Sequence, residues 1–208
     1  MKNSYNIMIV GVGGQGSLLA SRLLGNVFMQ KGFDVKVSEV HGMSQRGGSV
    51  VTYVKAGDQV FSPTIEPGEA DAIISFEQLE GARWISYLKK DGTLIVNTQK
   101  IDPMPVITGA ASYPENLIEK CRSLGANVID VDALSLAEQA GSAKATNVVL
   151  MGVLANHMNM EDEIWQNALT ACVPKKFMEL NQKAFALGKA AKLSLIHISE
   201  PTRRTPIS

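Results

Sequence analysis

Three glycines near the start of the chain are spaced like a strand-to-helix turn that can bind an anion. The stretch Asn6–Gly16 reads NIMIVGVGGQG, so Gly11, Gly13 and Gly16 follow the apolar run Ile7–Val10 in a G-x-G-x-x-G pattern. Gly11 allows a tight turn, Gly13 allows close approach of backbone to a ligand, and Gly16 allows a helix to pack close to the sheet. The free N–H groups of that helix would face an anion. The alternative is a tight turn that binds no nucleotide.

An amphipathic helix is predicted behind this turn. Its apolar positions recur with helical spacing and Gly32 is a plausible end; they are Ala20, Leu23, Leu24, Val27 and Phe28. A second strand is predicted at Phe33–Val37. In a dinucleotide-binding fold an acid near the end of that strand holds a ribose, and Glu39 is the candidate. The alternative for Glu39 is a solvated or ion-paired strand end.

The loop after the second strand reads HGMSQRGGS and is rich in glycines and hydrogen-bond donors. Arg46 offers a planar fork of donors suited to phosphate or carboxylate, and His41 is the one candidate for proton transfer. Both loops are expected to leave the carboxyl ends of adjacent strands, where open α/β sheets bind ligands. We therefore predict a shared anion site or a subunit contact; its candidate residues are Gly11, Gly13, Gly14, Gln15, Gly16, His41, Gly42, Ser44, Gln45, Arg46, Gly47 and Gly48.

The rest of the chain predicts one α/β domain over residues 1–192. Strands are expected before residue 132, among them a hairpin whose second strand is Gln59–Phe61, and a helix is expected at Glu77–Lys90. A short strand at Val106–Ile107 and helices from Ala133 onward complete the pattern. The predicted fold is a Rossmann-like three-layer domain with a mixed, mainly parallel sheet and a helical C-terminal layer.

The composition narrows the class of protein. Twenty basic and twenty acidic residues give a net charge of zero, which argues against binding to nucleic acid through bulk charge. No apolar run is long enough to span a membrane and no signal peptide precedes the first strand, so we expect a cytoplasmic protein. The two cysteines, Cys121 and Cys172, are far apart. They cannot hold an iron–sulfur cluster alone, and no metal site is predicted.

Two loops together carry a resemblance to a known family. G-V-G-G-Q-G at Gly11–Gly16, H-G-M-S-Q-R-G-G at His41–Gly48 and K-A-T-N at Lys144–Asn147 resemble the gamma-type domain of 2-oxoacid:ferredoxin oxidoreductases. The version with H-G-M-S-Q-R-G-G is most similar to the indolepyruvate branch of that family, at its beta subunit. The resemblance covers roughly residues 4 to 190.

The resemblance implies an oxidative decarboxylation. An aryl 2-oxoacid such as indolepyruvate and coenzyme A would give an acyl-CoA, carbon dioxide and reduced ferredoxin. Thiamine diphosphate, magnesium and 4Fe-4S clusters would be held by a large alpha subunit, and this chain would be a required non-redox subunit. The backbone of Gly13–Gly16 with Arg46 would hold coenzyme A phosphates, or both loops would only dock the alpha subunit. Asn147 would line the same cleft or act as an ordinary helix cap.

Two other function classes stay open from the residues. One is a stand-alone NAD-binding oxidoreductase, and the other is a nucleotide-binding module without catalysis. The C-terminal stretch from Leu193 to Ser208 has no periodicity and resembles the translation of sequencing-adapter read-through. We predict a non-native or disordered tail there and leave it out of the fold and the site.

Overall fold

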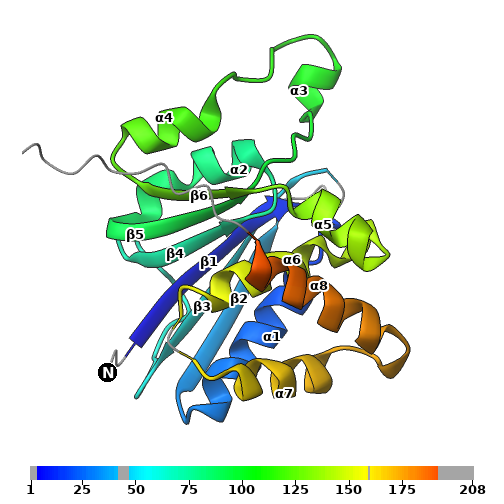
Figure 1. Cartoon of the computed structure of the whole chain (residues 1–208). Helices are drawn as coiled ribbons and strands as arrows, with labels where there is room; N and C mark the ends of the chain where they lie inside the picture. Colours follow the sequence, from blue (N-terminus) through cyan, green and yellow to red (C-terminus); the bar gives the residue numbers. More distant parts are fainter. Residues whose placement is uncertain (1–3, 42–46, 159, 192–208) are drawn as a thin grey trace, which may run out of the picture.

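The sheet of this protein has six strands with helices on both faces (Figure 1). The computed structural model describes residues 4–41, 47–158 and 160–191. The strand order is β2-β3-β1-β4-β5-β6. Strands β1, β4, β5 and β6 are parallel, whereas β3 is antiparallel to both β1 and β2. The strands are β1 (Ser4–Val12), β2 (Asp34–His41), β3 (Ser49–Gly57), β4 (Ala70–Ser75), β5 (Leu88–Asn97) and β6 (Asn127–Val131).

The helices divide between the two faces of the sheet (Figure 1). The α-helices are α1 (Ser17–Gln30), α2 (Gln78–Arg83), α3 (Met104–Ile107), α4 (Leu117–Ser123), α5 (Ala133–Ala140), α6 (Thr146–Ala155), α7 (Asp162–Cys172) and α8 (Met178–Ala190). Short 3-10 turns are η1 (Ile85–Tyr87), η2 (Ala143–Ala145) and η3 (Lys175–Phe177). Helices α2 and α4 cover one face; α1 and α5 to α8 form the other layer. The predicted three-layer fold with a mixed, mainly parallel sheet is confirmed.

Alternation along the strands produces two cores. In β1, Ile7 and Ile9 face α1 and the C-terminal helices, while Met8 and Val10 face α2 and α4. All four side chains are at most 2% exposed. Because successive side chains of a strand point to opposite faces, a strand covered on both faces reads as a continuous apolar run. Burying each such side chain contributes about 2 kcal/mol.

The first predicted helix is confirmed, with its expected end. Its apolar face is fully buried against the sheet. Gly32 follows it with φ 83°, and the Gly32 N–H donates to the carbonyl of Met29. A left-handed glycine after the last turn satisfies carbonyls that the helix leaves free.

The predicted hairpin is wrong in its partner. Residues Gln59–Phe61 form no strand; instead β3 lies between β1 and β2, pairing with β1 along its whole length and with β2 from Val50 to Gly57. With a strand on each side, β3 has no free edge for a returning strand. The second strand is also longer than predicted, since β2 runs from Asp34 to His41 and includes Glu39.

The helix predicted at Glu77–Lys90 is confirmed only in its first part. Helix α2 ends at Arg83, a 3-10 turn follows, and β5 begins at Leu88 because Leu88 pairs with Ala70 of β4. The predicted strand at Val106–Ile107 belongs instead to the short helix α3, which begins after Pro103. Proline before a helix supplies a preset backbone angle and lacks only an N–H that would be unpaired there.

The helices from Ala133 onward agree with the prediction. Helix α5 begins at Ala133, as predicted, and Asp132 caps it by accepting from Ser135 N. Helix α6 is apolar on every side and buried from Asn147 to Ala155, because it lies between the sheet and α8. Within the described ranges, no helix is long and apolar enough to cross a membrane.

Candidate functional site

The first glycine turn is closed by a side chain of its own. Gln15 Oε1 accepts from Val12 N at 2.7 Å, and Gln15 Nε2 donates to the carbonyl of Phe76 at 3.2 Å. A Cβ on Gly11 would lie 2.7 Å from that Oε1 and 3.0 Å from the Phe76 Cβ. A side chain at Gly11 would therefore crowd Phe76 and displace the Gln15 amide, which folds back between the ends of β1 and β4. The crevice between these two strands is filled by protein.

Gly16 packs against a different neighbour, Asn147. It has φ 88°, and a Cβ there would lie 2.5 Å from Nδ2 of Asn147. Asn147 is 3% exposed, donates from Nδ2 to the Gly16 carbonyl at 3.1 Å and accepts from Val148 N at 2.9 Å. Asn147, predicted to line the same cleft as the glycine turn, lies against it in the structure. The contact joins the start of α1 to the start of α6.

The N-terminus of α1 has no side-chain cap, and an acid lies beside it. The N-cap residue is Gly16, which has no side chain to accept a capping hydrogen bond, and no acid lies in the first turn. Glu39 of β2 accepts from the hydroxyl of Ser17 at 2.9 Å and from Thr52 at 3.2 Å. A carboxylate near a helix N-terminus is favoured by the helix dipole, and it disfavours a second anion at the same place.

The two glycine loops meet at the carboxyl edge of the sheet. Gly13 N donates to the carbonyl of Gly48 at 2.9 Å, and Val12 pairs with Ser49. The strands that lead into the loops are not neighbours, contrary to expectation, because β3 lies between β1 and β2. The two loops nevertheless touch at Gly13 and Gly48, and a shared anion site or subunit contact there stays a prediction. The predicted residues Gly42, Ser44, Gln45 and Arg46 lie outside the described residues.

The other predicted residues of the loops fall into place around this contact. Gly14 has φ 101° and Gly47 has φ 74°, and both have open space where a Cβ would be. His41 is the last residue of β2, exposed and opposite Val50. A role of His41 in proton transfer stays a prediction.

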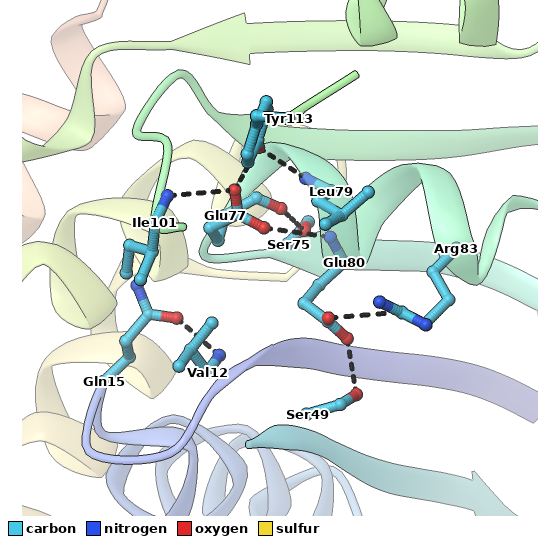
Figure 2. Close-up of polar contacts among 10 residues, drawn as sticks. All are labelled: Val12, Gln15, Ser49, Ser75, Glu77, Leu79, Glu80, Arg83, Ile101 and Tyr113. Carbon is cyan, nitrogen blue, oxygen red and sulfur yellow. Dashed lines mark hydrogen bonds and ion pairs between the residues drawn. The ribbon is translucent and has the colours of Figure 1, made fainter. Parts of the chain in front are cut away.

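A buried acid that the sequence reasoning missed organises the same edge. Glu77 follows β4 and is 1% exposed. Figure 2 shows its carboxylate accepting from Ile101 N at 3.2 Å, from Glu80 N at 3.0 Å and from the hydroxyl of Tyr113. Glu77 therefore caps α2 and ties the segment between β5 and α4 to it. A buried carboxylate is stable only when donors replace its water, and here three do so.

The Tyr113 hydroxyl lies beside the buried Glu77 carboxylate, which changes its pKa. This hydroxyl donates to Glu77 and accepts from Leu79 N at 3.1 Å. Burial, together with the hydrogen bond to the Glu77 carboxylate, raises the pKa of the Tyr113 phenol well above its ordinary value. The phenol therefore stays protonated throughout the physiological range and remains a donor.

Glu80 is a second buried acid, one turn further along α2. Its carboxylate accepts from the hydroxyl of Ser49 at 2.5 Å and from Nε of Arg83 at 3.2 Å (Figure 2). Ser49 directly follows Gly47 and Gly48, so Glu80 fixes the end of the second glycine loop. One signal could have suggested these acids: Glu77 and Glu80 stand three residues apart after an apolar strand, as in a helix cap.

Cavities lie at both edges of the sheet. One of about 280 Å³ lies at the carboxyl edge, between the glycine loops, α2 and the segment Ile101–Pro105. Another of about 480 Å³ lies at the amino edge, near Tyr5, Phe33 and His157. The first contains the candidate residues Gly47 and Gly48, whereas the described loop residues do not line the second. The carboxyl edge is therefore the candidate functional site.

The described residues hold no group suited to a metal or a cluster. Among them, no three His, Cys, Asp or Glu side chains lie close enough to bind a metal ion. Cys121 is a buried residue of α4, and Cys172 is half-buried at the end of α7. Burial raises the pKa of both thiols, which disfavours the thiolate form that binds metals.

Comparison with known proteins identifies the family. A family model described as pyruvate ferredoxin/flavodoxin oxidoreductase matches residues 6–191. The chain belongs to this family. It is 43% identical over 196 residues to the indolepyruvate oxidoreductase subunit IorB of Thermococcus kodakarensis, covering 90% of this chain and 96% of that protein. It is 42% identical over 187 residues to IorB of Archaeoglobus fulgidus, covering 88% of this chain and 92% of the relative.

A solved structure of the oxidoreductase family shares the fold. The pyruvate oxidoreductase subunit PORC of Thermotoga maritima superposes with a TM-score of 0.69 and 21% identity, over 91% of this chain and 97% of that one. At this identity the likeness shows the fold alone. The predicted resemblance to gamma-type subunits of 2-oxoacid:ferredoxin oxidoreductases, and to the indolepyruvate branch, is confirmed.

Proposed function

We propose that this chain is the non-redox small subunit of an indolepyruvate:ferredoxin oxidoreductase. The observation that carries the proposal is the similarity to IorB subunits over almost the whole length of both chains. The complex would convert an aryl 2-oxoacid and coenzyme A to acyl-CoA and carbon dioxide, passing two electrons to ferredoxin. Among the described residues, no three His, Cys, Asp or Glu side chains lie close enough to hold a metal ion, and burial disfavours the thiolate form of both cysteines. We therefore assign thiamine diphosphate and the clusters to a large partner subunit.

The carboxyl edge is the surface through which we propose that the small subunit meets its partner. Much of its hydrogen-bonding capacity is used internally: Gln15 closes the first turn, Asn147 holds Gly16, and Glu77 and Glu80 hold the surrounding segments. Such a network presents a rigid shape at low conformational cost, as a docking surface requires. A preformed network also holds the first glycine turn and Ser49 in place when a partner binds.

Coenzyme A binding is the second candidate for this edge. The N-terminus of α1 without a side-chain cap favours a phosphate beside Gly13–Gly16, with Arg46 as a further contact. The negative charge of Glu39, which accepts from Ser17, opposes a phosphate at this position. The substitution Arg46→Ala separates the two readings. Retained assembly with a raised KM for coenzyme A favours phosphate binding, whereas lost assembly favours docking.

The NAD-binding alternative gains no support. In a dinucleotide fold the second strand lies beside the first, so that its acid reaches the ribose. Here β3 separates them, and Glu39 is engaged by Ser17 and Thr52. Gln15 fills the crevice beside β1 where a pyrophosphate would approach. The similar proteins are subunits of ferredoxin oxidoreductases.

Co-expression with a large subunit of an indolepyruvate:ferredoxin oxidoreductase tests the proposal. The readouts are copurification and dye reduction that depends on indolepyruvate and coenzyme A, measured without oxygen. Activity only when both chains are present is the expected result. A large subunit that is loaded with clusters yet neither binds this chain nor gains activity from it would refute the proposal.

A further inference from the structure

Arg83 is held at the carboxyl edge in a way that the proposed docking role does not require. Its Nε donates to Glu80 Oε1 at 3.2 Å (Figure 2). The Glu80 side chain is 6% exposed, whereas the Arg83 side chain is 52% exposed. A buried carboxylate therefore holds one edge of a guanidinium whose remainder is open to solvent. This arrangement fixes the planar donor fork in advance and lowers the cost of binding an anion.

The surroundings of Arg83 fit a small anion. Arg83 lines the cavity of about 280 Å³ together with Gly47 and Gly48. Gly47 has φ 74°, and a Cβ there would meet no atom within 4 Å, so a ligand can approach the backbone closely. Backbone amides of glycines and an arginine fork are the donors that proteins commonly use for phosphate.

The acids that line the same cavity do not prevent Arg83 from attracting an anion. Glu80 is engaged by Ser49 and Arg83, and the Glu77 carboxylate already accepts three hydrogen bonds. Asp102 lines the cavity but is exposed, so water and salt screen its charge. The exposed Arg83 guanidinium is therefore the charged group in this cavity that an anionic ligand can bind.

We propose that Arg83 is a binding residue for a phosphate-bearing small molecule in this cavity, and that Glu80 is its positioning residue. The contact would use the free donors of the Arg83 guanidinium and the backbone of Gly47 and Gly48. This site is separate from the N-terminus of α1 and does not involve Arg46.

Titration of the full chain with inorganic pyrophosphate tests the proposal, with calorimetry and the side-chain Nε–H signals of the arginines as readouts. We expect saturable binding that shifts the Arg83 signal. Arg83→Ala should weaken binding at least roughly tenfold, the loss of a charge-assisted contact. Arg83→Lys should weaken it severalfold because lysine lacks the fork. Glu80→Gln, which can still accept from Ser49 but loses the charge that holds Arg83, should fall between wild type and Arg83→Ala.

Two controls make the outcome decisive. Arg122→Lys makes the same change at an arginine that pairs with Glu119 and does not line this cavity, and it should leave pyrophosphate binding unchanged. Malonate should bind more weakly than pyrophosphate. No saturable binding, equal binding by Arg83→Ala, or tighter binding of malonate would overturn the proposal. Repeating the titration on the copurified complex keeps it distinct from the subunit assignment: failed assembly refutes that assignment and leaves the pyrophosphate result on the full chain standing.

Discussion

The seam between α6 and α8 and the carboxyl edge of the sheet are built on opposite principles. At the seam, Gly152 and Gly188 let the two helix backbones touch: a Cβ on Gly152 would lie 3.0 Å from Lys189 N and 3.1 Å from Gly188 Cα. At the edge, polar side chains far apart in sequence hold loops together, such as Asn147 and Gly16. The seam depends on two glycines that have no Cβ, whereas the edge depends on particular hydrogen-bond donors and acceptors. Substitutions should therefore fail for different reasons in the two regions.

The largest effect is expected at the seam. Gly152→Ala places a Cβ against the backbone carbonyl of Phe185, which cannot rotate away as a side chain would. We expect a loss of about 3 kcal/mol in the free energy of unfolding, the upper range for overpacking. Chemical denaturation of the full chain measures it.

A matched control lies in α1. Gly25→Ala is the same substitution in a helix, but its Cβ would lie 3.9 Å from Val35 and Val37, an ordinary contact. Here we expect a gain of about 0.5 to 1 kcal/mol, because alanine loses less backbone entropy than glycine. Equal effects of Gly152→Ala and Gly25→Ala would show that the seam is not tightly packed.

The next effect is expected at the edge. Asn147→Ala removes the donor to the Gly16 carbonyl and the acceptor for Val148 N, at a site 3% exposed. We expect a loss of about 2 kcal/mol, since buried polar groups are left unpaired. Asn147→Asp should lose more, because a carboxylate oxygen would face the Gly16 carbonyl. If aspartate were tolerated better than alanine, the Asn147 contact would not be what holds the turn.

Local patterns predicted several helices and the first glycine turn, and little of the rest of the edge. The helical period placed α1 and α5, and the glycine spacing placed the first turn, because these depend on neighbours within a few residues. The position of β3 and the reach of Glu77 to Tyr113 depend on contacts 36 or more residues apart. Alternation predicts a strand but not its partners, so the insertion of β3 between β1 and β2 could not be read from it.

A smaller effect is expected for Tyr113→Phe. The change removes one of three donors to Glu77 and should cost about 1 kcal/mol at neutral pH. The pKa of the folded phenol lies above that of the unfolded one, about 10. Wild-type stability is therefore constant below pH 10 as far as this group is concerned, and falls as the pH rises beyond it.

The pH dependence separates this contact from ordinary packing. Tyr113→Phe should lose the part of the alkaline decline that belongs to this phenol, so that the two proteins converge in stability above pH 10. Unfolding by urea at pH 7 and pH 10.5 measures the difference. A stability gap that stays constant over this range would mean that the phenol does not donate to the Glu77 carboxylate.

The smallest effect is expected from deleting residues 193–208, which we assign to neither region. The family model ends at residue 191, and α8 ends at Ala190 with Ala191 N donating to the Gly188 carbonyl. The deletion therefore leaves the seam intact, since Gly188 and its partner Val149 both lie before residue 193. We expect a midpoint of thermal unfolding within about 2 °C of the full chain, less than a loss of 1 kcal/mol would cause in a domain of this size. A larger drop would mean that the C-terminal stretch packs on the protein, and the boundary of the domain would then have to move beyond residue 192.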